Sequence, residues 1–208
     1  MRALILFILL TFAAPATAGT RVSLLPFESG LSFTPESPRA IQADHPLFRR
    51  IELEETENMP GRIGSFLTPI TKPSEFNEAL RSTLASANML AETSDTARAR
   101  LRVVWRQFEL PFRISISSKA MVAIYYELSR LDNGQVIFSR EIVTHAEARG
   151  GDGSTRARGT GRAAILANIA SVTLCLQKAA FGQDPSNCAL QTVGSFSAPI
   201  TVAIPVYR

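Results

Sequence analysis

The sequence comprises 208 residues with a formal net charge of +4, and 46% of its residues are hydrophobic. This length fits one folded domain with arms or a small appendage. The modest basic charge is compatible with a position near an anionic membrane or glycan, and it gives no support for nucleic-acid binding.

The N-terminus has the pattern of a secretory signal peptide. A charged start at residues 1–2 precedes an apolar run at 3–14 and a cleavage site of small residues at 16–18. The apolar run is shorter than the roughly 20 residues that a membrane span needs. Gly19 follows in place of a lipid-bearing cysteine. We therefore predict a signal peptide at 1–18 and a periplasmic mature chain without a lipid anchor or transmembrane segment.

Prolines at 35, 38 and 46 predict an irregular N-terminal arm over 19–46. An α+β domain is expected at 47–208, with a core at 47–178 and a C-terminal loop and edge strand at 179–208. Alternating apolar residues predict its first strand over 47–55. Acidic residues of this region face either the arginines of the next strand or, as we favour, solvent. They are Glu52, Glu54, Glu55 and Glu57.

A first helix is predicted over 73–88. Pro73 suits the first turn, where its missing N–H costs nothing. Phe76, Leu80, Leu84 and Ala87 follow at helical spacing, so we expect this apolar stripe to pack on a sheet.

Residues 98–106 alternate between apolar and basic side chains, which is typical of a strand with one buried and one exposed face. The apolar positions are Ala99, Leu101, Val103 and Trp105. Three basic positions, Arg100, Arg102 and Arg106, are here called the arginine strip. The strip either solvates an exposed sheet face, which we favour, or binds an anionic partner such as lipid head groups or acidic glycan.

A β-hairpin with its turn at 131–135 has the strongest local signal. β-Branched and aromatic residues are frequent over 121–128, and Asp132-Asn133-Gly134 supplies turn residues that tolerate positive φ angles. The strand that resumes at Val136 alternates poorly, which predicts a bulge or a strand half-buried on both faces.

A second helix is predicted after the glycine-rich stretch 149–154. Its apolar stripe comprises Ile165, Ile169, Val172 and Leu176. Gly159 and Gly161 weaken the first turns, which places the regular start near Arg162. The basic residues Arg156, Arg158 and Arg162, here called the basic entry, are predicted to contact an anionic partner or surface.

These elements predict an α+β fold in which two helices pack on one face of a mostly antiparallel sheet. Their order is strand, helix, strand, hairpin, helix and strand. The last strand, at 200–206, contains Pro205 and is therefore placed at an edge.

Cys175 and Cys188 are the only cysteines. An even pair in an oxidising compartment predicts a disulfide, with two independent thiols as the alternative.

No constellation in the sequence indicates catalysis. His45 and His145 have no further ligands at metal spacing, so we expect neither a metal nor a cofactor. A Gly-x-Ser-x-Gly nucleophile elbow is absent. Glu127 and Glu141 are expected to face each other across the hairpin. They are either ordinary strand positions, as we favour, or paired carboxylates for glycoside hydrolysis.

Four segments carry a family resemblance: Phe76–Leu84, Trp105–Phe108, Tyr125–Phe138 and Ala163–Leu176. Together they resemble small Gram-negative envelope proteins, the outer-membrane lipoproteins and ABC-transport auxiliary components with a strand–helix–two-strand–helix core. The resemblance covers about residues 47–178 and implies the same core. Some relatives carry the label UDP-N-acetylglucosamine acyltransferase, but this chain lacks the tandem repeats of hexapeptide acyltransferases.

We therefore predict a non-enzymatic periplasmic accessory protein that supports envelope assembly or lipid transport. Its partner would be another envelope protein or an anionic lipid or glycan surface. Two alternatives stay open: an enzyme acting on a glycan or acyl substrate, and a carrier that holds a small lipid in an apolar cavity.

Overall fold

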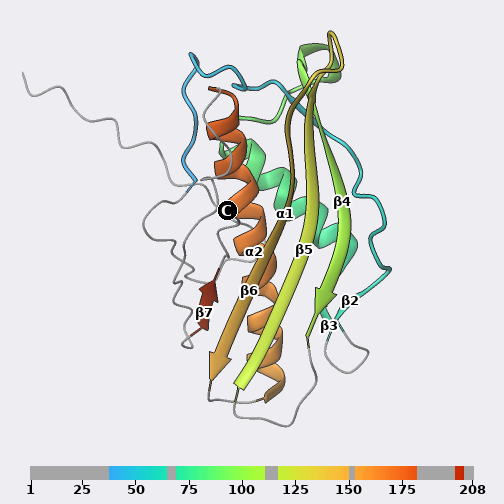
Figure 1. Cartoon of the computed structure of the whole chain (residues 1–208), viewed down its shortest axis with the longest axis vertical. Coiled ribbons are helices and arrows are strands. Elements are labelled where there is room, and N and C mark those ends of the chain that lie inside the picture. The colour runs from blue at the N-terminus through green and yellow to red at the C-terminus, as the bar shows by residue number, and fades with distance from the viewer. Residues whose placement is uncertain (1–37, 65–68, 111–116, 150–152, 182–199, 204–208) are drawn as a thin grey trace, which may run out of the picture.

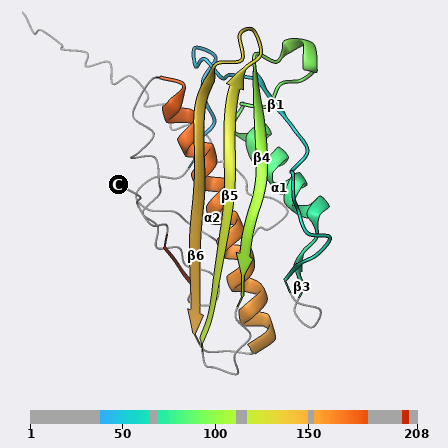
Figure 2. The same cartoon turned by 45° about the vertical axis from the view of Figure 1, so that its right-hand side comes forward.

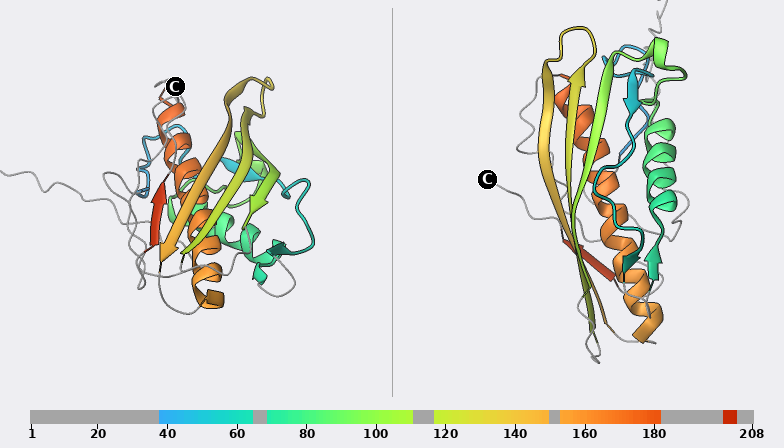
Figure 3. Two further views of the ribbon diagram at one scale, coloured as in Figure 1. Left: turned by 60° about the horizontal axis from the view of Figure 1, so that its bottom comes forward. Right: turned by 90° about the vertical axis from the view of Figure 1, so that its right-hand side faces the viewer.

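Two layers make up the described part of the chain, which comprises residues 38–64, 69–110, 117–149, 153–181 and 200–203 of a computed structural model (Figure 1). One layer is a five-stranded sheet with the order β1-β4-β5-β6-β7 (Figure 2). Both helices lie on one face of it (Figure 3), so the predicted α+β fold is confirmed. The strands are β1 (Ile51–Leu53), β4 (Ala99–Glu109), β5 (Ser117–Arg130), β6 (Val136–Arg149) and β7 (Ile200–Ala203), and the helices are α1 (Pro73–Ser86) and α2 (Gly153–Ala179).

The sheet is mostly antiparallel, as predicted. β4, β5, β6 and β7 pair antiparallel in that order, and β1 alone among the described strands pairs in parallel, with β4. β7 occupies an edge, where it was expected. A second, two-stranded sheet of β2 (Ile63–Gly64) and β3 (Pro69–Thr71) was not predicted, nor was the 3₁₀ turn η1 (Ser94–Thr96).

The alternation predicted for β4 is confirmed. Its apolar positions from Ala99 to Trp105 are buried, and Arg100, Arg102 and Arg106 are exposed on the opposite face. Trp105 contacts Phe76 of α1 edge-to-face, with ring centroids 5.3 Å apart. This aromatic pair packs the first helix against the sheet.

The β5–β6 hairpin turns at 131–135, as predicted, with Gly134 at a φ of 71°. Asn133 contributes through its side chain, whose Oδ1 accepts a hydrogen bond from the Gln135 N–H at 2.9 Å. In β6, Phe138 opposes Leu128 while Val136 opposes Ser129, so the register skips Ile137. The poor alternation after Val136 therefore does mark a bulge.

α1 begins at Pro73, as predicted, and its first turn is stabilised by Glu75. One Glu75 oxygen, Oε2, accepts hydrogen bonds from the Thr71 hydroxyl at 2.7 Å and the Lys72 N–H at 3.2 Å. These two bonds lower the pKa of the Glu75 carboxyl, the Thr71 bond most. The helix ends just before Asn88, whose φ of 58° turns the chain away.

The start predicted for α2 near Arg162 is wrong, because the helix already begins at Gly153. Gly161 has a tertiary reason to be small: a Cβ there would lie 2.9 Å from Cγ2 of Ile70 in β3. The glycine lets β3 approach the helix closely, and this contact offsets its low helix propensity.

The apolar stripe predicted for α2 is buried, but the burial extends well beyond it, since nearly every side chain from Thr160 to Leu176 is buried. A helix buried on all sides needs no amphipathic pattern. Its length and composition would suffice to cross a membrane, but 89% of its most apolar window is buried inside the protein. The predicted lack of a transmembrane segment stays a prediction.

A buried hydrogen-bond network fixes α2 on the sheet. The Tyr126 hydroxyl donates to Oδ1 of Asn168 at 2.8 Å, and Nδ2 of Asn168 donates to the Ile142 carbonyl at 2.8 Å. The Thr144 hydroxyl donates to the Ala164 carbonyl at 2.7 Å. Complete burial raises the pKa of Tyr126, so this hydroxyl stays protonated and remains a donor.

The described end of the N-terminal arm, residues 38–46, has no helix or extended strand, but it packs on the domain. The Ile41 N–H donates to the Ala87 carbonyl at 3.0 Å. His45 of the arm is buried against α2. Its Nε2 lies 3.1 Å from the Gln177 carbonyl oxygen, and its Nδ1 accepts a hydrogen bond from the Leu47 N–H at 3.1 Å. Apolar Ile41 in the arm and Leu47 directly after it are both buried, so this irregular segment is part of the packed structure.

Five sequence predictions fall wholly or partly on residues outside the described part. They are the signal peptide at 1–18, the arm at 19–37, the C-terminal loop at 182–199, the edge signal of Pro205 and the pairing partner Cys188.

Candidate functional site

The arginine strip is largely engaged in ion pairs within the chain. Arg100 Nε lies 3.3 Å from Oε2 of Glu52 and 3.4 Å from Oε1 of Glu54. Arg102 binds Glu57 through both carboxylate oxygens, with Nη2 and Oε2 2.9 Å apart. Glu52, Glu54 and Glu57 therefore face the strip, which was the less favoured of the two predictions.

Parallel pairing of β1 with β4 explains this arrangement. Glu52 lies opposite Arg100, and a bridge beyond β1 places Glu57 opposite Val104. The hydrogen bond from Arg102 lowers the pKa of the Glu57 carboxyl, and the carboxylate in turn raises the pKa of Arg102. Both groups stay charged at neutral pH and compensate each other. The strip thus presents less net charge to an anionic surface than its sequence suggests.

Arg106 has a different environment from the other two arginines of the strip. It is exposed, and its guanidinium lies over the Tyr125 ring, 5.4 Å from the centroid. Such a cation–π contact leaves the hydrogen-bonding edge of a guanidinium accessible to a further partner.

The basic entry lies at the end of the molecule where β3 meets α2. Arg162 Nε donates to the Ile70 carbonyl of β3 at 3.1 Å, and Arg156 Nε donates to the Ser118 hydroxyl of β5 at 3.2 Å. Arg158 is exposed. Two of these arginines thus position elements of the fold, and a role in partner binding stays a prediction for all three.

Glu127 and Glu141 do not face each other, which corrects the sequence expectation. The hairpin register places Glu127 opposite Ser139 and Glu141 opposite Tyr125. The Tyr125 hydroxyl donates to Oε2 of Glu127 at 2.8 Å. Glu127 therefore has the environment of an ordinary position on the exposed sheet face.

Metal ligands are not gathered anywhere in the described residues, where no group of three His, Cys, Asp or Glu side chains could hold an ion. Cys175 is buried in α2, and Cys188 lies outside the described part, so their disulfide stays a prediction. Mass measurement after alkylation without reductant tests it, with no modified cysteine expected.

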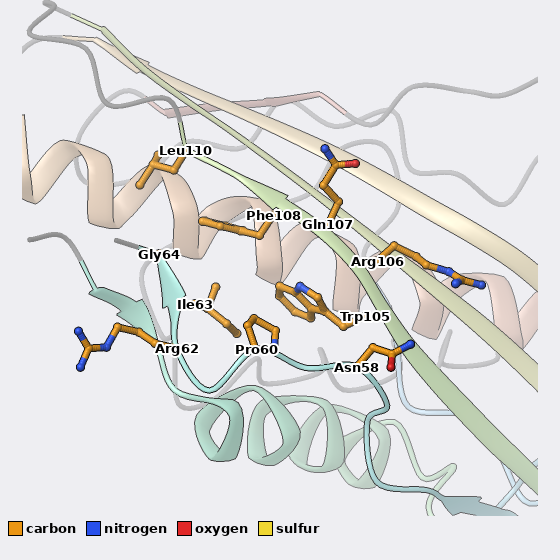
Figure 4. A pocket seen from close by; sticks show the side chains of 10 residues that line it. All are labelled: Asn58, Pro60, Arg62, Ile63, Gly64, Trp105, Arg106, Gln107, Phe108 and Leu110. Atoms are coloured by element: carbon orange, nitrogen blue, oxygen red, sulfur yellow. The ribbon is translucent and has the colours of Figure 1, made fainter. Parts of the chain in front are cut away.

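An open groove of about 560 Å³ lies beside the end of β4 (Figure 4). Trp105 and Ile63 are buried and form its floor, while Phe108 and Leu110 are half-buried and line its side. Ten of the described residues line it: Asn58, Pro60, Arg62, Ile63, Gly64, Trp105, Arg106, Gln107, Phe108 and Leu110. Figure 4 shows Trp105, Pro60 and Ile63 converging at the centre, while Arg62 and Arg106 extend outward on opposite sides.

Two backbone features form this groove. The register of β4 against β5 shifts between Trp105 and Gln107, a bulge that re-aims the side chains beyond it. On the other side, Asn58 adopts a φ of 56° just after the Glu57 N–H and carbonyl have bonded to β4. The chain leaves the edge of β4 at this point and returns as β2, which forms the opposite wall.

Sequence reasoning missed the groove, although two signals for it exist. Trp105 and Phe108 are three residues apart, which breaks the alternation of a strand and indicates a bulge. The Asn58-Met59-Pro60-Gly61 stretch indicates a turn or loop. The isolated apolar residue Ile63 shortly after it indicates that the chain packs on the domain again. Of the predicted site residues, the structure brings only Arg106 to the groove lining.

The comparisons with known proteins give no family. Neither a protein-family model nor a curated protein matches the chain. Solved structures with a partly similar fold include a DUF330 protein from Xanthomonas campestris, with 10% identity, a TM-score of 0.49 and coverage of 64% of this chain and 87% of that chain. A lipoprotein candidate from Caulobacter crescentus has 14% identity, a TM-score of 0.44 and coverage of 66% and 95%. The hypothetical protein CT253 from Chlamydia trachomatis has 9% identity, a TM-score of 0.47 and coverage of 64% and 98%.

Only one of these three descriptions, that of the lipoprotein candidate, refers to the envelope. At TM-scores below 0.5, the likenesses carry no argument about this chain. Nothing in them supports the acyltransferase label that some relatives of the resembled family carry.

Proposed function

We propose that the chain is a non-enzymatic accessory protein of the bacterial envelope, which acts by binding another envelope component through the groove beside β4. The signal-peptide pattern at 1–18 and the resemblance of residues 47–178 to envelope proteins support the location. The proposal concerns binding alone and assigns no reaction to the protein.

One observation carries the proposal, the composition of the groove. Aromatic and aliphatic side chains form its floor and side, and two arginines stand at its rim. Interfaces that carry binding energy are enriched in Trp and Arg in this arrangement, with apolar anchors at the centre and charges outside. A volume of about 560 Å³ falls in the range of specific binding sites.

The lining also favours binding over group transfer. The ten described lining residues are of types that pack, donate or accept hydrogen bonds, or carry a fixed positive charge. General acid–base or nucleophilic catalysis relies on side chains such as carboxylates, imidazoles, thiols or activated hydroxyls. The described lining offers none of them.

Site-specific photo-crosslinking in intact cells tests the proposal. A photoreactive amino acid would replace Gln107, which is exposed in the groove lining, and in a matched control it would replace Ser86, exposed at the end of α1. We expect discrete adducts with an envelope component from position 107 that position 86 does not give. Identical adducts from both positions, or none from position 107, would contradict binding through the groove.

A further inference from the structure

We propose that the occupant of the groove is an extended segment of a partner polypeptide, which adds as a strand to the outer edge of β4. The segment would place a large apolar side chain on the floor and an acidic side chain against Arg106. This inference rests on the proposed function and names the chemistry of its partner.

The edge of β4 carries the first step of the argument. β1 pairs with β4 at 99–101, and Glu57 extends this pairing to Val104 and Trp105. Beyond Trp105, no described strand pairs with this side of β4, although β4 continues to Glu109. Main-chain N–H and C=O groups along such an edge are a template for a further strand.

The course of the chain explains why this edge borders a groove. A strand continuing straight from Glu57 would follow β4 into the groove. The left-handed Asn58, with Pro60 after it, instead diverts the chain outward, and Ile63 and Gly64 return as the far wall. The groove therefore runs beside the strand edge, in the direction that an added strand would take.

The floor determines which side chains an added strand could carry. Successive side chains of a strand point to opposite faces, so alternate residues of the partner would point toward Trp105 and Phe108. Both are aromatic and lie beside aliphatic Ile63. A large apolar side chain would be desolvated there, which is the usual source of affinity in strand addition next to a pocket.

Charge at the rim determines the flanking residues. Arg62 and Arg106 extend on opposite sides of the floor. Arg106 is exposed and stacked on Tyr125, which holds its guanidinium in place. An acidic side chain next to the apolar residue would pair with Arg106, and a basic segment would be repelled.

Strand pairing distinguishes a polypeptide from an anionic lipid in this groove. A lipid could use the apolar floor and the arginines, but an acyl chain has no groups to bond the N–H and C=O row of β4. An extended peptide satisfies the floor, the charges and the edge together. If the occupant is a peptide strand, its affinity should depend on its main-chain N–H groups, and this dependence distinguishes it from a lipid.

A library of short random peptides displayed on phage provides the first test. It would be selected on the full exported chain and counter-selected on an Arg106→Glu variant. We expect enriched peptides in which large apolar residues alternate with acidic ones. If no peptide is enriched on the wild type over the variant, the inference is overturned.

The second test uses the strongest selected peptide as a fluorescent probe, together with a copy N-methylated at alternate amides. N-methylation keeps the side chains but removes N–H donors from one edge, so we expect a loss of affinity of tenfold or more, in the order of a few lost hydrogen bonds. Arg106→Glu should weaken binding by about tenfold, whereas Arg81→Glu, an exposed arginine on α1, should leave it unchanged. Equal binding of the methylated copy would overturn strand addition.

Phosphatidylglycerol vesicles separate this inference from the proposed function. Vesicle binding that Arg106→Glu abolishes, with no peptide enriched, would reject a polypeptide occupant while the groove remains the contact surface. If neither peptides nor vesicles bind and position 107 gives no specific crosslink in cells, the proposed function fails as well.

Discussion

Two regions of this protein with paired polar side chains can be compared, the interface between α2 and the sheet and the exposed outer face of β4. In the first region, Tyr126 and Asn168 are completely buried. In the second, Arg102 and Glu57 form an equally direct contact in the presence of water, each with more than 40% of its side chain exposed. The donor–acceptor distances are similar, 2.8 Å for Tyr126–Asn168 and 2.9 Å for Arg102 Nη2–Glu57 Oε2, but only the first pair is shielded from water.

This difference separates stability from recognition. A buried group that loses its partner keeps the full cost of its desolvation, so the interior network holds α2 in one position on the sheet. Exposed charges lose little because water replaces a lost partner. Substitutions of charged residues on the outer face should therefore have little effect on stability. Evolution can adapt the groove at the end of this face to a partner without destabilising the fold.

Replacing Asn168 should have the largest effect. Asn168→Ala leaves the Tyr126 hydroxyl and the Ile142 carbonyl without their partner in a dry interior, so we expect unfolding to become easier by about 3 kcal/mol. Urea titration followed by circular dichroism measures this. Tyr126→Phe removes a single hydroxyl and should cost about 1 kcal/mol. A value for Asn168→Ala within the error of the wild type would show that the network does not hold the helix.

His45 tests whether the N-terminal arm belongs to the interior region. His45→Ala removes the contact with the Gln177 carbonyl and leaves the buried Leu47 N–H without an acceptor. We expect a loss of about 2 kcal/mol in the free energy of unfolding. His145→Ala, at an exposed position of β6, is the matched control and should have no comparable effect. Equal effects of the two substitutions would place His45 outside the cooperative core.

Gly161 tests how closely β3 approaches α2. In an ordinary helix, glycine to alanine stabilises by about 1 kcal/mol. Here the new Cβ would lie about 3 Å from three side-chain atoms of buried Ile70, so we expect Gly161→Ala to destabilise by about 1 to 2 kcal/mol instead. The double variant with Ile70→Ala removes the clash. In that background the alanine at 161 should no longer destabilise, and a gain in stability from Gly161→Ala alone would contradict the close packing.

Features that depend on neighbouring residues could be predicted from the sequence, whereas features that depend on contacts between distant residues could not. The start of α1 at Pro73 and the turn at 131–135 have local signals, and both were predicted. The alternation of β4 also needs only neighbouring residues. In contrast, the first turns of α2 include Gly161, which lies against Ile70. These two residues are far apart in sequence, so helix propensity alone places the start of α2 wrongly.

The candidate site was less predictable for the same reason. The pairing of Arg100 and Arg102 with acidic residues depends on the parallel register between β1 and β4, which no local pattern encodes. The separation of Glu127 from Glu141 depends on the hairpin register and the bulge that adjoins it. The groove needs the bulge in β4 and the turn at Asn58 together, so its residues are spread over two distant segments.

The smallest effect is expected for Arg102, and it completes the comparison. Arg102→Ala should change stability far less than Asn168→Ala, because both members of the pair with Glu57 are solvated. The difference in the free energy of unfolding between Arg102→Ala and the wild type should depend on pH. The folded-state pKa of Glu57 lies below its ordinary value of 4.5, so the contribution of the pair is present above that value. It is lost as the pH falls through the lowered folded pKa. Urea titrations from pH 7 to pH 3 should therefore converge for the two proteins at low pH, and also at high salt, which screens the pair. A difference that grows on acidification, or one as large as that of Asn168→Ala, would show that the outer ion pair contributes to stability as a buried one does.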